Sequence, residues 1–263
     1  MQIITLLSDW GTRDPYLASV KGQLALRLPE AQIIDISHDI TPFDITQASF
    51  VLRQAFSNFP EGTIHLIGIN TEASIETPHT LIKYCGHYFI GADNGIFNLL
   101  MSGEEAQQII ELDLMQDSEF FTFSTKDLFI KAAVCLATGK AAEALGTVKT
   151  TINTRYSFLP VKDGNVLKGK VIYIDNYENL ITNITAQQFE SFGKGNPFQV
   201  LFRSSQYRIK RLSTSYSDVP EGEMVALFGT HGFLEIAINR GTAASLLGMS
   251  VDDMIRIEFQ FPQ

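Results

Sequence analysis

Residues 33–69 read IIDISHDITPFDITQASFVLRQAFSNFPEGTIHLIGI and hold three segments with different patterns. The apolar runs at 33–36 and 64–69 are short and rich in β-branched residues, which is typical of buried strands. Between them, residues 45–56 carry apolar side chains at helical spacing. They follow Thr41, Pro42 and Asp44, which are residue types that begin helices. The stretch therefore predicts one strand–helix–strand unit of a parallel sheet.

The same alternation continues on both sides of this unit as far as residue 159. Residues 3–7 predict a further strand, and residues 16–28 and 127–138 predict helices, the last one ended by Gly139. After residue 159 the pattern changes to short strands separated by frequent turns, expected at 169–174, 197–202, 224–228 and 234–238. We therefore predict an α/β protein, with a mostly parallel sheet in residues 1–159 and a mainly antiparallel β domain in residues 160–263.

The composition of the chain disfavours some classes of partner and indicates where in the cell the protein is expected. The 263 residues include 20 Lys and Arg against 29 Asp and Glu, a net charge of -9, which disfavours binding to nucleic acid or to an anionic membrane. No apolar run approaches the ~18 residues of a membrane span, and no basic segment precedes the first apolar run. We expect a cytoplasmic protein with two buried, unpaired thiols, Cys85 and Cys135.

Ligands of open α/β sheets bind beyond the carboxyl ends of the strands. The loops expected there are residues 8–14, 37–44 and 70–79, and they are rich in carboxylates. The sequence has no glycine-rich phosphate motif, and Lys83 is the only Lys or Arg between Arg53 and Lys126. A small cationic ligand therefore fits these loops better than a polyphosphate. The alternative is that their Asp and Thr residues only cap helices and close turns.

The five histidines do not have the spacing of a metal site, so we expect no metal. His65 lies within an apolar strand and is expected to be a core imidazole. His38 and His79 lie in the ligand-side loops, and each could have either a structural or a functional role. No G-x-S-x-G elbow is present, which sets aside serine esterase chemistry.

Three further segments have both a structural and a binding interpretation. Residues 120–127 place aromatics, including Phe123, before a helix that Ser124 or Thr125 could cap; the aromatics either fill the core or form a wall for a nucleobase or sulfonium. Residues 175–183 hold amides and carboxylates that could form turns or bind a purine or an amino acid. Residues 229–233 join two strands as a hairpin or a ligand loop.

Taken together, these segments resemble the S-adenosyl-L-methionine hydroxide adenosyltransferases, relatives of the fluorinase and chlorinase enzymes. The resemblance spans nearly the whole chain and rests on the order and spacing of short motifs. In the first domain these motifs are Thr5 to Gly11, Asp14, Lys21-Gly22, residues 34–42, residues 59–63 and Asp93-Asn94-Gly95; in the second they are Ile174-Asp175, Asn179, residues 182–184, Tyr216, Gly222-Glu223 and residues 232–237.

The resemblance implies a C-terminal β-barrel and a homotrimer whose substrate site lies between the first domain of one subunit and the second domain of its neighbour. The implied substrate is S-adenosylmethionine, and no cofactor is required. In the first domain, Asp9 would hold the ribose hydroxyls and Phe43 would wall the sugar and sulfonium, and Asp14 and Phe123 are further substrate-binding candidates. In the second, Tyr177, Asn179 and Tyr216 would surround adenine, and Asp175 and Thr230 would take the methionine ammonium and carboxylate. His231 is a further substrate-binding candidate.

The chain departs from the family pattern at the positions that activate water. Asn70 stands where the hydrolases have an aspartate, residues 70–80 hold no arginine, and Ser124 replaces a histidine. Neither Asn nor Ser is a base near neutral pH. Nor does the chain carry the aromatic residue and the Tyr-Ser pair of the halogenases, so halide use is not supported. Glu72, Glu76 or His79 in the altered loop could substitute as base. Hydrolysis to adenosine and methionine with a rearranged base is one hypothesis, and a non-catalytic adenosyl binder or sensor is the other.

Overall fold

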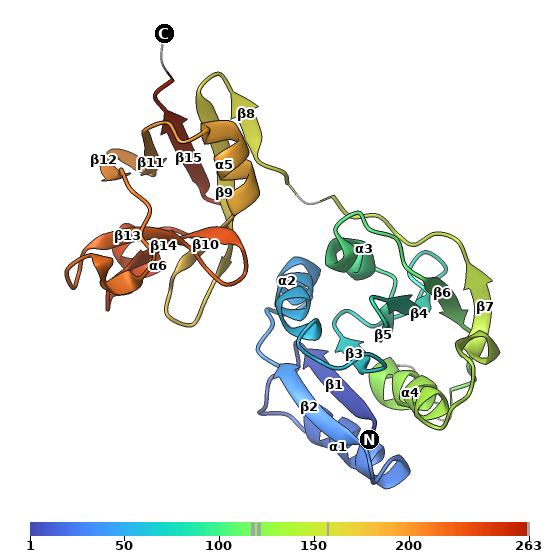
Figure 1. The fold of residues 1–263 in the computed structure, drawn as a ribbon. Helices are drawn as coiled ribbons and strands as arrows, with labels where there is room; N and C mark the ends of the chain where they lie inside the picture. The colour runs from blue at the N-terminus through green and yellow to red at the C-terminus, as the bar shows by residue number, and fades with distance from the viewer. Residues whose placement is uncertain (117–118, 120–121, 157, 262–263) are drawn as a thin grey trace. The chain divides into compact units, whose positions relative to one another are not determined.

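The computed structural model describes residues 1–116, 119, 122–156 and 158–261. The chain forms two compact units, one from Met1 to Tyr156 and one from Ser157 to Gln263, and each is described by itself (Figure 1). Within the described residues, no helix is long and apolar enough to cross a membrane.

The first unit is built on a seven-stranded sheet with the order β2-β1-β3-β5-β4-β6-β7. β1 pairs in parallel with β2 and β3, and β3 pairs in parallel with β5. β4, β6 and β7 extend the sheet with antiparallel pairings. The strands are β1 (Ile3–Ser8), β2 (Gln32–Ser37), β3 (Ile64–Gly68), β4 (His79–Tyr84), β5 (His87–Ala92), β6 (Gln108–Leu112) and β7 (Gly146–Lys149). The predicted α/β class, with parallel strands at the N-terminus, is confirmed.

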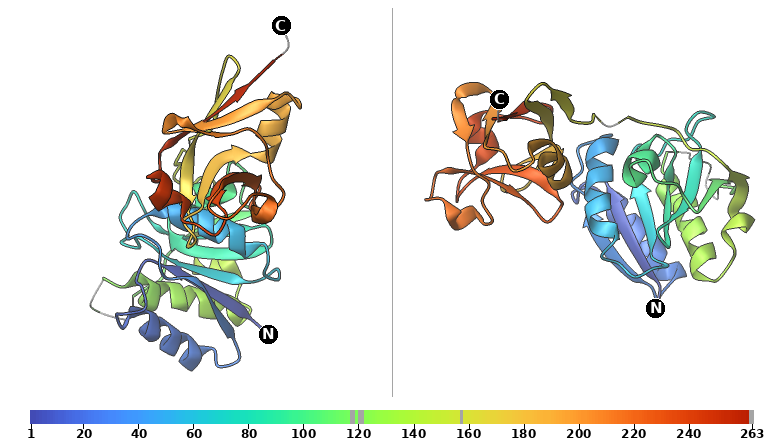
Figure 2. Two further views of the ribbon diagram at one scale, coloured as in Figure 1. Left: turned by 90° about the vertical axis from the view of Figure 1, so that its left-hand side faces the viewer. Right: turned by 45° about the horizontal axis from the view of Figure 1, so that its top comes forward.

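Helices cover both faces of this sheet, as the second view of Figure 2 shows. Apolar side chains of α1 and α4 enter one buried cluster, and those of α2 and α3 enter another. The helical segments are α1 (Tyr16–Arg27), α2 (Ile45–Phe56), α3 (Ile96–Met101), the π-helical turn η1 (Thr125–Phe129), α4 (Ile130–Ala137) and the 3-10 turn η2 (Ala142–Leu145). The helices bury both faces of the sheet, and surface loops at the ends of such a scaffold commonly carry binding residues.

Helix α2 has the bounds predicted from the sequence. The side chain of Asp44 accepts hydrogen bonds from the backbone N–H groups of Thr46 (3.0 Å) and Gln47 (2.9 Å), which satisfies donors that a helix start leaves unpaired. Ala48 and Leu52 are fully buried on the predicted apolar face. The cap fixes the point at which the loop after β2 ends.

The helix predicted over 127–138 begins two residues earlier than expected, as the π-helical turn η1 that continues into α4. Ser124 occupies the N-cap position, but its side chain makes no capping hydrogen bond, so the predicted cap is wrong. Ser124 and Thr125 are instead buried, at 4% and 1% exposed. A π-helical turn inside a helix often marks a functional site.

The second unit is an antiparallel sheet with the order β12-β11-β15-β9-β10-β14-β13, and β8 pairs with β9. β12 also contacts β13, so the sheet curls into a nearly closed barrel, which confirms the predicted antiparallel β-barrel fold. Its elements are β8 (Val161–Asp163), β9 (Val166–Ile174), β10 (Leu180–Thr185), α5 (Ala186–Gly193), β11 (Phe198–Phe202), β12 (Ser204–Ile209), η3 (Tyr216–Asp218), β13 (Met224–Phe228), β14 (Phe233–Ile238), α6 (Ala243–Leu247) and β15 (Met254–Phe259).

The two cysteines are unpaired, as expected, but Cys85 is exposed and Cys135 is only half-buried, so the predicted burial of both thiols is wrong. Cys85 and Gly86 form the turn between β4 and β5, with φ values of 48° and 77°. Two-residue hairpin turns of this kind need positive φ at both positions. That geometry directs the Cys85 side chain outward.

Candidate functional site

The three carboxylate-rich loops emerge from one edge of the first unit. β1, β2 and β3 are parallel neighbours, so their carboxyl ends lie together, and the three loops follow these ends directly. The sequence-predicted residues Asp9, Asp14, Phe43, Asn70, Glu72 and His79 are all carried by these loops or by the strand that follows the third.

Asp9 joins the first loop to the second. The backbone N–H of Phe43 donates a hydrogen bond to Asp9 Oδ2 at 2.8 Å. Phe43 has φ of +67°, which is unusual for a residue with a side chain, and the residue is 71% exposed. Such strain persists only where surrounding contacts hold it, and it clusters at ligand sites. Asp14 is exposed in the same edge, beside the start of α1.

A chain of polar contacts that the sequence did not predict begins at Ser8, the residue before Asp9; Ser8 and His38 are buried, whereas Asp35 and Lys21 are partly exposed. Ser8 Oγ is 2.6 Å from His38 Nδ1, His38 Nε2 is 3.1 Å from Asp35 Oδ1, and Lys21 Nζ is 2.6 Å from Asp35 Oδ2. Burial raises the pKa of Asp35, but hydrogen bonds from Lys21 and His38 outweigh it, and the pKa lies below its usual value. Ser8 has no exposed surface, so its hydroxyl cannot meet a substrate, and the chain supports the loop that carries Asp9.

Phe123 belongs to an aromatic cluster at the same edge. Its ring meets those of Trp10 and Tyr16 edge-on, with centroids 5.1 Å and 5.3 Å away. Trp10 lies across Gly68, where an added Cβ would come 2.3 Å from the indole. The glycine at the end of β3 therefore lets Trp10 cover the strand end. Phe120 and Phe121, from the same predicted wall, lie outside the described residues.

The altered loop is tied to its neighbours by Asn70 and His79. The Asn70 carbonyl accepts a hydrogen bond from Asn94 Nδ2 at 3.2 Å, and His79 Nε2 donates to the Thr71 carbonyl at 2.8 Å. Burial lowers the pKa of His79, and the hydrogen bond to Thr71 opposes this shift. The imidazole is therefore neutral near pH 7, with its proton on Nε2. Glu72 is exposed on the loop between them.

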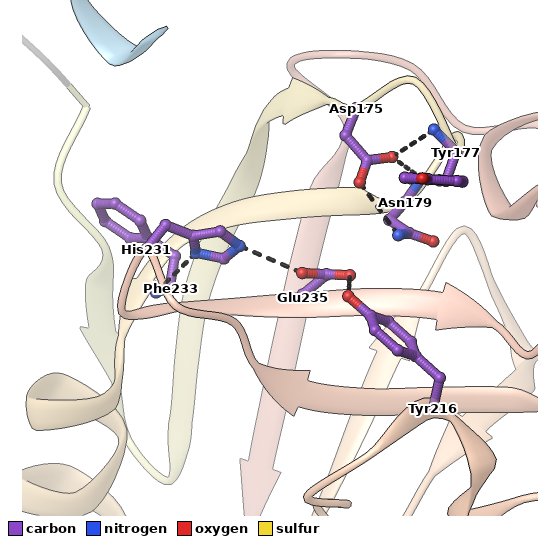
Figure 3. A network of polar contacts seen from close by, with 7 residues as sticks. All are labelled: Asp175, Tyr177, Asn179, Tyr216, His231, Phe233 and Glu235. Carbon is purple, nitrogen blue, oxygen red and sulfur yellow. Dashed lines mark hydrogen bonds and ion pairs between the residues drawn. The ribbon is translucent and has the colours of Figure 1, made fainter. Parts of the chain in front are cut away.

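In the second unit, Asp175 organises the turn between β9 and β10 (Figure 3). Its Oδ1 accepts from the backbone N–H groups of Tyr177 (2.9 Å) and Asn179 (2.8 Å), and its Oδ2 accepts from Asn179 Nδ2 (3.1 Å). Asn179 is buried, whereas the Tyr177 ring is 74% exposed. The structure thus brings these three predicted residues together, and the hydrogen bonds of Asp175 close the turn.

A second group, also drawn in Figure 3, is centred on Glu235, which the sequence did not predict as a site residue. Tyr216 donates its hydroxyl proton to Glu235 Oε1 at 2.7 Å, and His231 Nε2 lies 3.2 Å from Glu235 Oε2. Burial, the hydrogen bond with Glu235 and the charges of Glu235 and Asp175 raise the pKa of Tyr216. Thr230 is exposed in the hairpin turn before His231. The sequence signals for Glu235 are its place in the 232–237 motif of the family resemblance and a carboxylate inside the apolar strand β14.

The described residues contain no group of three or more His, Cys, Asp or Glu side chains able to hold a metal ion. The fold and its two clusters define a two-domain ligand-binding protein: an α/β unit with carboxylate-rich loops at one sheet edge, followed by an antiparallel barrel with a polar cluster on its turns. The chain belongs to the SAM hydroxide adenosyltransferase family. The family model of the N-terminal domain matches residues 4–146, and that of the C-terminal domain matches residues 169–256.

Similar proteins cover both units. A curated (R)-S-adenosyl-L-methionine hydrolase of Thermus thermophilus is 29% identical, over 98% of this chain and 100% of its own length. A fluorinase of Actinopolyspora mzabensis is 24% identical, over 92% of each chain. A crystal structure of an uncharacterized conserved protein from Thermotoga maritima is 27% identical, with a TM-score of 0.87, over 97% of this chain and 99% of that one.

Proposed function

We propose that the chain hydrolyses S-adenosylmethionine to adenosine and methionine. The observation that carries this proposal is its similarity to an (R)-S-adenosyl-L-methionine hydrolase over 98% of its length, which includes both clusters. The carboxylate-rich edge of the first unit supports it because such an edge suits a cationic sulfonium. The name of the relative specifies the (R) epimer at sulfur, so we propose that this chain also takes that epimer.

The reaction needs little from the protein beyond placement. A water oxygen attacks C5′ of the ribose while the C5′–S bond breaks, its electron pair passes to sulfur, and the proton of the water leaves to a base or to solvent. The sulfonium is already an activated leaving group, so neither a metal nor a cofactor is proposed. Holding water in line with the C5′–S bond can contribute about 7–11 kcal/mol through proximity.

We propose for the site residues the roles that the family resemblance implies. Asp9 binds the ribose hydroxyls beside Asp14, and Phe43 and Phe123 wall the sugar and sulfonium. Adenine is bound by Tyr177, Asn179 and Tyr216. The methionine end of the substrate is bound by Asp175, Thr230 and His231. We further propose a cytoplasmic homotrimer, in which the first unit of one subunit and the second unit of its neighbour share each site.

The base that accepts the proton of water must be another group, because Asn70 and Ser124 cannot accept a proton near neutral pH. In the altered loop, His79 is neutral and keeps an unprotonated Nδ1, since its Nε2–H donates to Thr71. Glu72 is exposed on the same loop. We propose that one of these two side chains, or no side chain at all, receives the proton.

The altered positions also favour a second candidate, a non-catalytic binder of adenosine or S-adenosylmethionine. Release of adenosine from purified protein and S-adenosylmethionine, followed by chromatography, separates the two. The enzyme proposal predicts adenosine well above a heat-denatured sample, with the (R) epimer consumed faster than the (S) epimer. Background turnover together with a ligand-induced rise in melting temperature would support the binder. If the protein shows no turnover and no thermal shift, both proposals are contradicted.

A further inference from the structure

We propose that Glu235 is a positioning residue of the ligand site, which fixes Tyr216 and His231 in one arrangement. The inference rests on the proposed function, because Tyr216 and His231 are placed beside the ligand there. Nothing in the family resemblance assigns Glu235 a role.

Glu235 lies in the middle of β14 and is 3% exposed, although it is a carboxylate. It stands opposite Leu227 of β13 and Ile181 of β10, so both flanking strands present apolar residues at this register. A carboxylate in such a place is costly unless hydrogen bonds satisfy it. Tyr216 and His231 supply those bonds, one to each oxygen (Figure 3).

The hydrogen bonds define the proton positions on His231. The backbone N–H of Phe233 donates to Nδ1 at 3.1 Å, so Nδ1 carries no proton. Nε2 therefore carries the proton and donates it to Glu235 Oε2. These two hydrogen bonds hold His231 in one tautomer, and its ring also stacks on that of Phe233, with the centroids 6.0 Å apart.

Gly229 shows that the arrangement is close-packed. A Cβ added at this glycine would come 2.4 Å from His231 Nε2 and 2.9 Å from Glu235 Oε2. Any side chain at position 229 would push the imidazole away from Glu235. The turn before β14 thus leaves room for this pair of side chains.

Tyr216 is fixed in a similar way. Its hydroxyl is engaged by Glu235, while the residue as a whole remains 43% exposed, so the ring and not the hydroxyl faces outward. A flat aromatic face held by a buried carboxylate suits stacking against a nucleobase. Glu235 acts on the ligand through this ring and does not itself contact the ligand.

The test is a double-mutant cycle on adenosine binding, measured by calorimetry with Glu235→Gln, Tyr216→Phe and the double variant. Glu221→Gln is the matched control, because Glu221 is an exposed glutamate of the same unit that pairs with Arg240. We expect each single variant to weaken binding about tenfold, from the loss of one charge-assisted hydrogen bond. The double variant should lose less than the sum of the two single losses, because Glu235→Gln removes the charge from the same hydrogen bond that Tyr216→Phe removes. Glu221→Gln should bind as the wild type does.

A second readout does not depend on the ligand. Nitrogen-15 NMR of the free protein should show one fixed His231 tautomer with the proton on Nε2, and Glu235→Gln should give a mixture of tautomers. Unchanged adenosine affinity in Glu235→Gln, or an unchanged tautomer, would overturn the proposal, even if the variant melts at a lower temperature. If wild-type protein binds no adenosine while the tautomer still responds to Glu235→Gln, the proposed function has failed and the positioning of His231 stands.

Discussion

The backbone N–H of Phe43 donates a hydrogen bond to Asp9 Oδ2 across 2.8 Å, and this contact joins the loop after β1 to the loop after β2. A carboxylate that accepts one backbone proton still has lone pairs for a ligand. Asp9 therefore has two tasks: it holds a strained loop, and it offers charge to the proposed ribose. Substitutions at this position can separate the two.

We predict that Asp9→Ala loses adenosine binding by tenfold or more, since hydrogen bonds to a charged group contribute about 1.5–3 kcal/mol each. Asp9→Asn keeps an acceptor for the Phe43 N–H, so it should retain the loop and lose only the effect of charge. Calorimetry with adenosine and with 2′,3′-dideoxyadenosine provides the test. Replacing adenosine by the dideoxy compound should lower the affinity of the wild type far more than it lowers the affinity of the Asp9→Ala variant. An equal cost in both proteins would remove Asp9 from the ribose site.

Phe43 offers a prediction about strain. A residue with a side chain at φ of +67° is disfavoured by roughly 1–2 kcal/mol, and glycine avoids this cost. Glycine also gains freedom in the unfolded chain, which offsets part of the benefit. We therefore expect Phe43→Gly to be more stable than Phe43→Ala by up to about 1 kcal/mol in urea unfolding. Both should bind ligand more weakly than the wild type, because both remove the exposed ring. Tighter binding by either variant would contradict the proposed wall.

The altered loop allows a test of the base. If Glu72 or His79 receives the proton of water, Glu72→Gln or His79→Gln should lower kcat while the affinity for adenosine changes little. Because the pKa of His79 is lowered by burial, a reaction that uses His79 as base should show a constant rate above pH 6.5. A drop in rate and affinity together would assign the residue to binding. Unchanged kcat in both variants would mean that neither Glu72 nor His79 acts as base.

His65 gives a prediction about stability and pH. Its Nδ1 lies 2.6 Å from Thr5 Oγ1, and burial, followed by the charge of His87, lowers its pKa to about 3. Below pH 6.5 the unfolded chain binds a proton that the folded chain refuses, so stability falls as pH decreases toward 3. This group contributes about 1.4 kcal/mol per pH unit in that window. Above pH 6.5 its contribution is constant.

Urea unfolding between pH 7 and 5 measures this slope. His65→Phe should reduce the slope by the amount given above, while its stability at pH 7 falls because the Thr5 hydroxyl loses its partner. A residual slope should remain, since burial also lowers the pKa values of His79 and His87. An identical slope in the wild type and His65→Phe would contradict the buried, neutral state of His65.

Local patterns predict the first half of the fold well, and the reason is physical. α2 carries its own cap and its own apolar face, so its bounds of Ile45 and Phe56 follow from adjacent residues. β4 and β5 are less distinct because both are buried and their hairpin turn is Cys85-Gly86, which lacks the Asn or Asp usual before such a glycine. The early start of α4 as a π-helical turn depends on packing, and no local signal marks it.

The site residues also fall into two groups: those that the local sequence indicates and those that only the folded chain brings together. Asp9, Asp175 and Asn179 lie in loops whose composition alone suggests a function, and the structure brings Asp175 and Asn179 together. Glu235 depends on Tyr216, which is 19 residues away, and the Ser8–His38 pair spans 30 residues. Contacts of this kind exist only once strands have paired, so sequence patterns cannot indicate them.

The most direct test of the central claim is turnover of S-adenosylmethionine in water enriched in oxygen-18, with mass spectrometry of both products. Attack of water at C5′ predicts one labelled oxygen in the 5′-hydroxyl of adenosine and none in methionine. Adenosine no higher than in a heat-denatured sample, or label in methionine, would contradict the account.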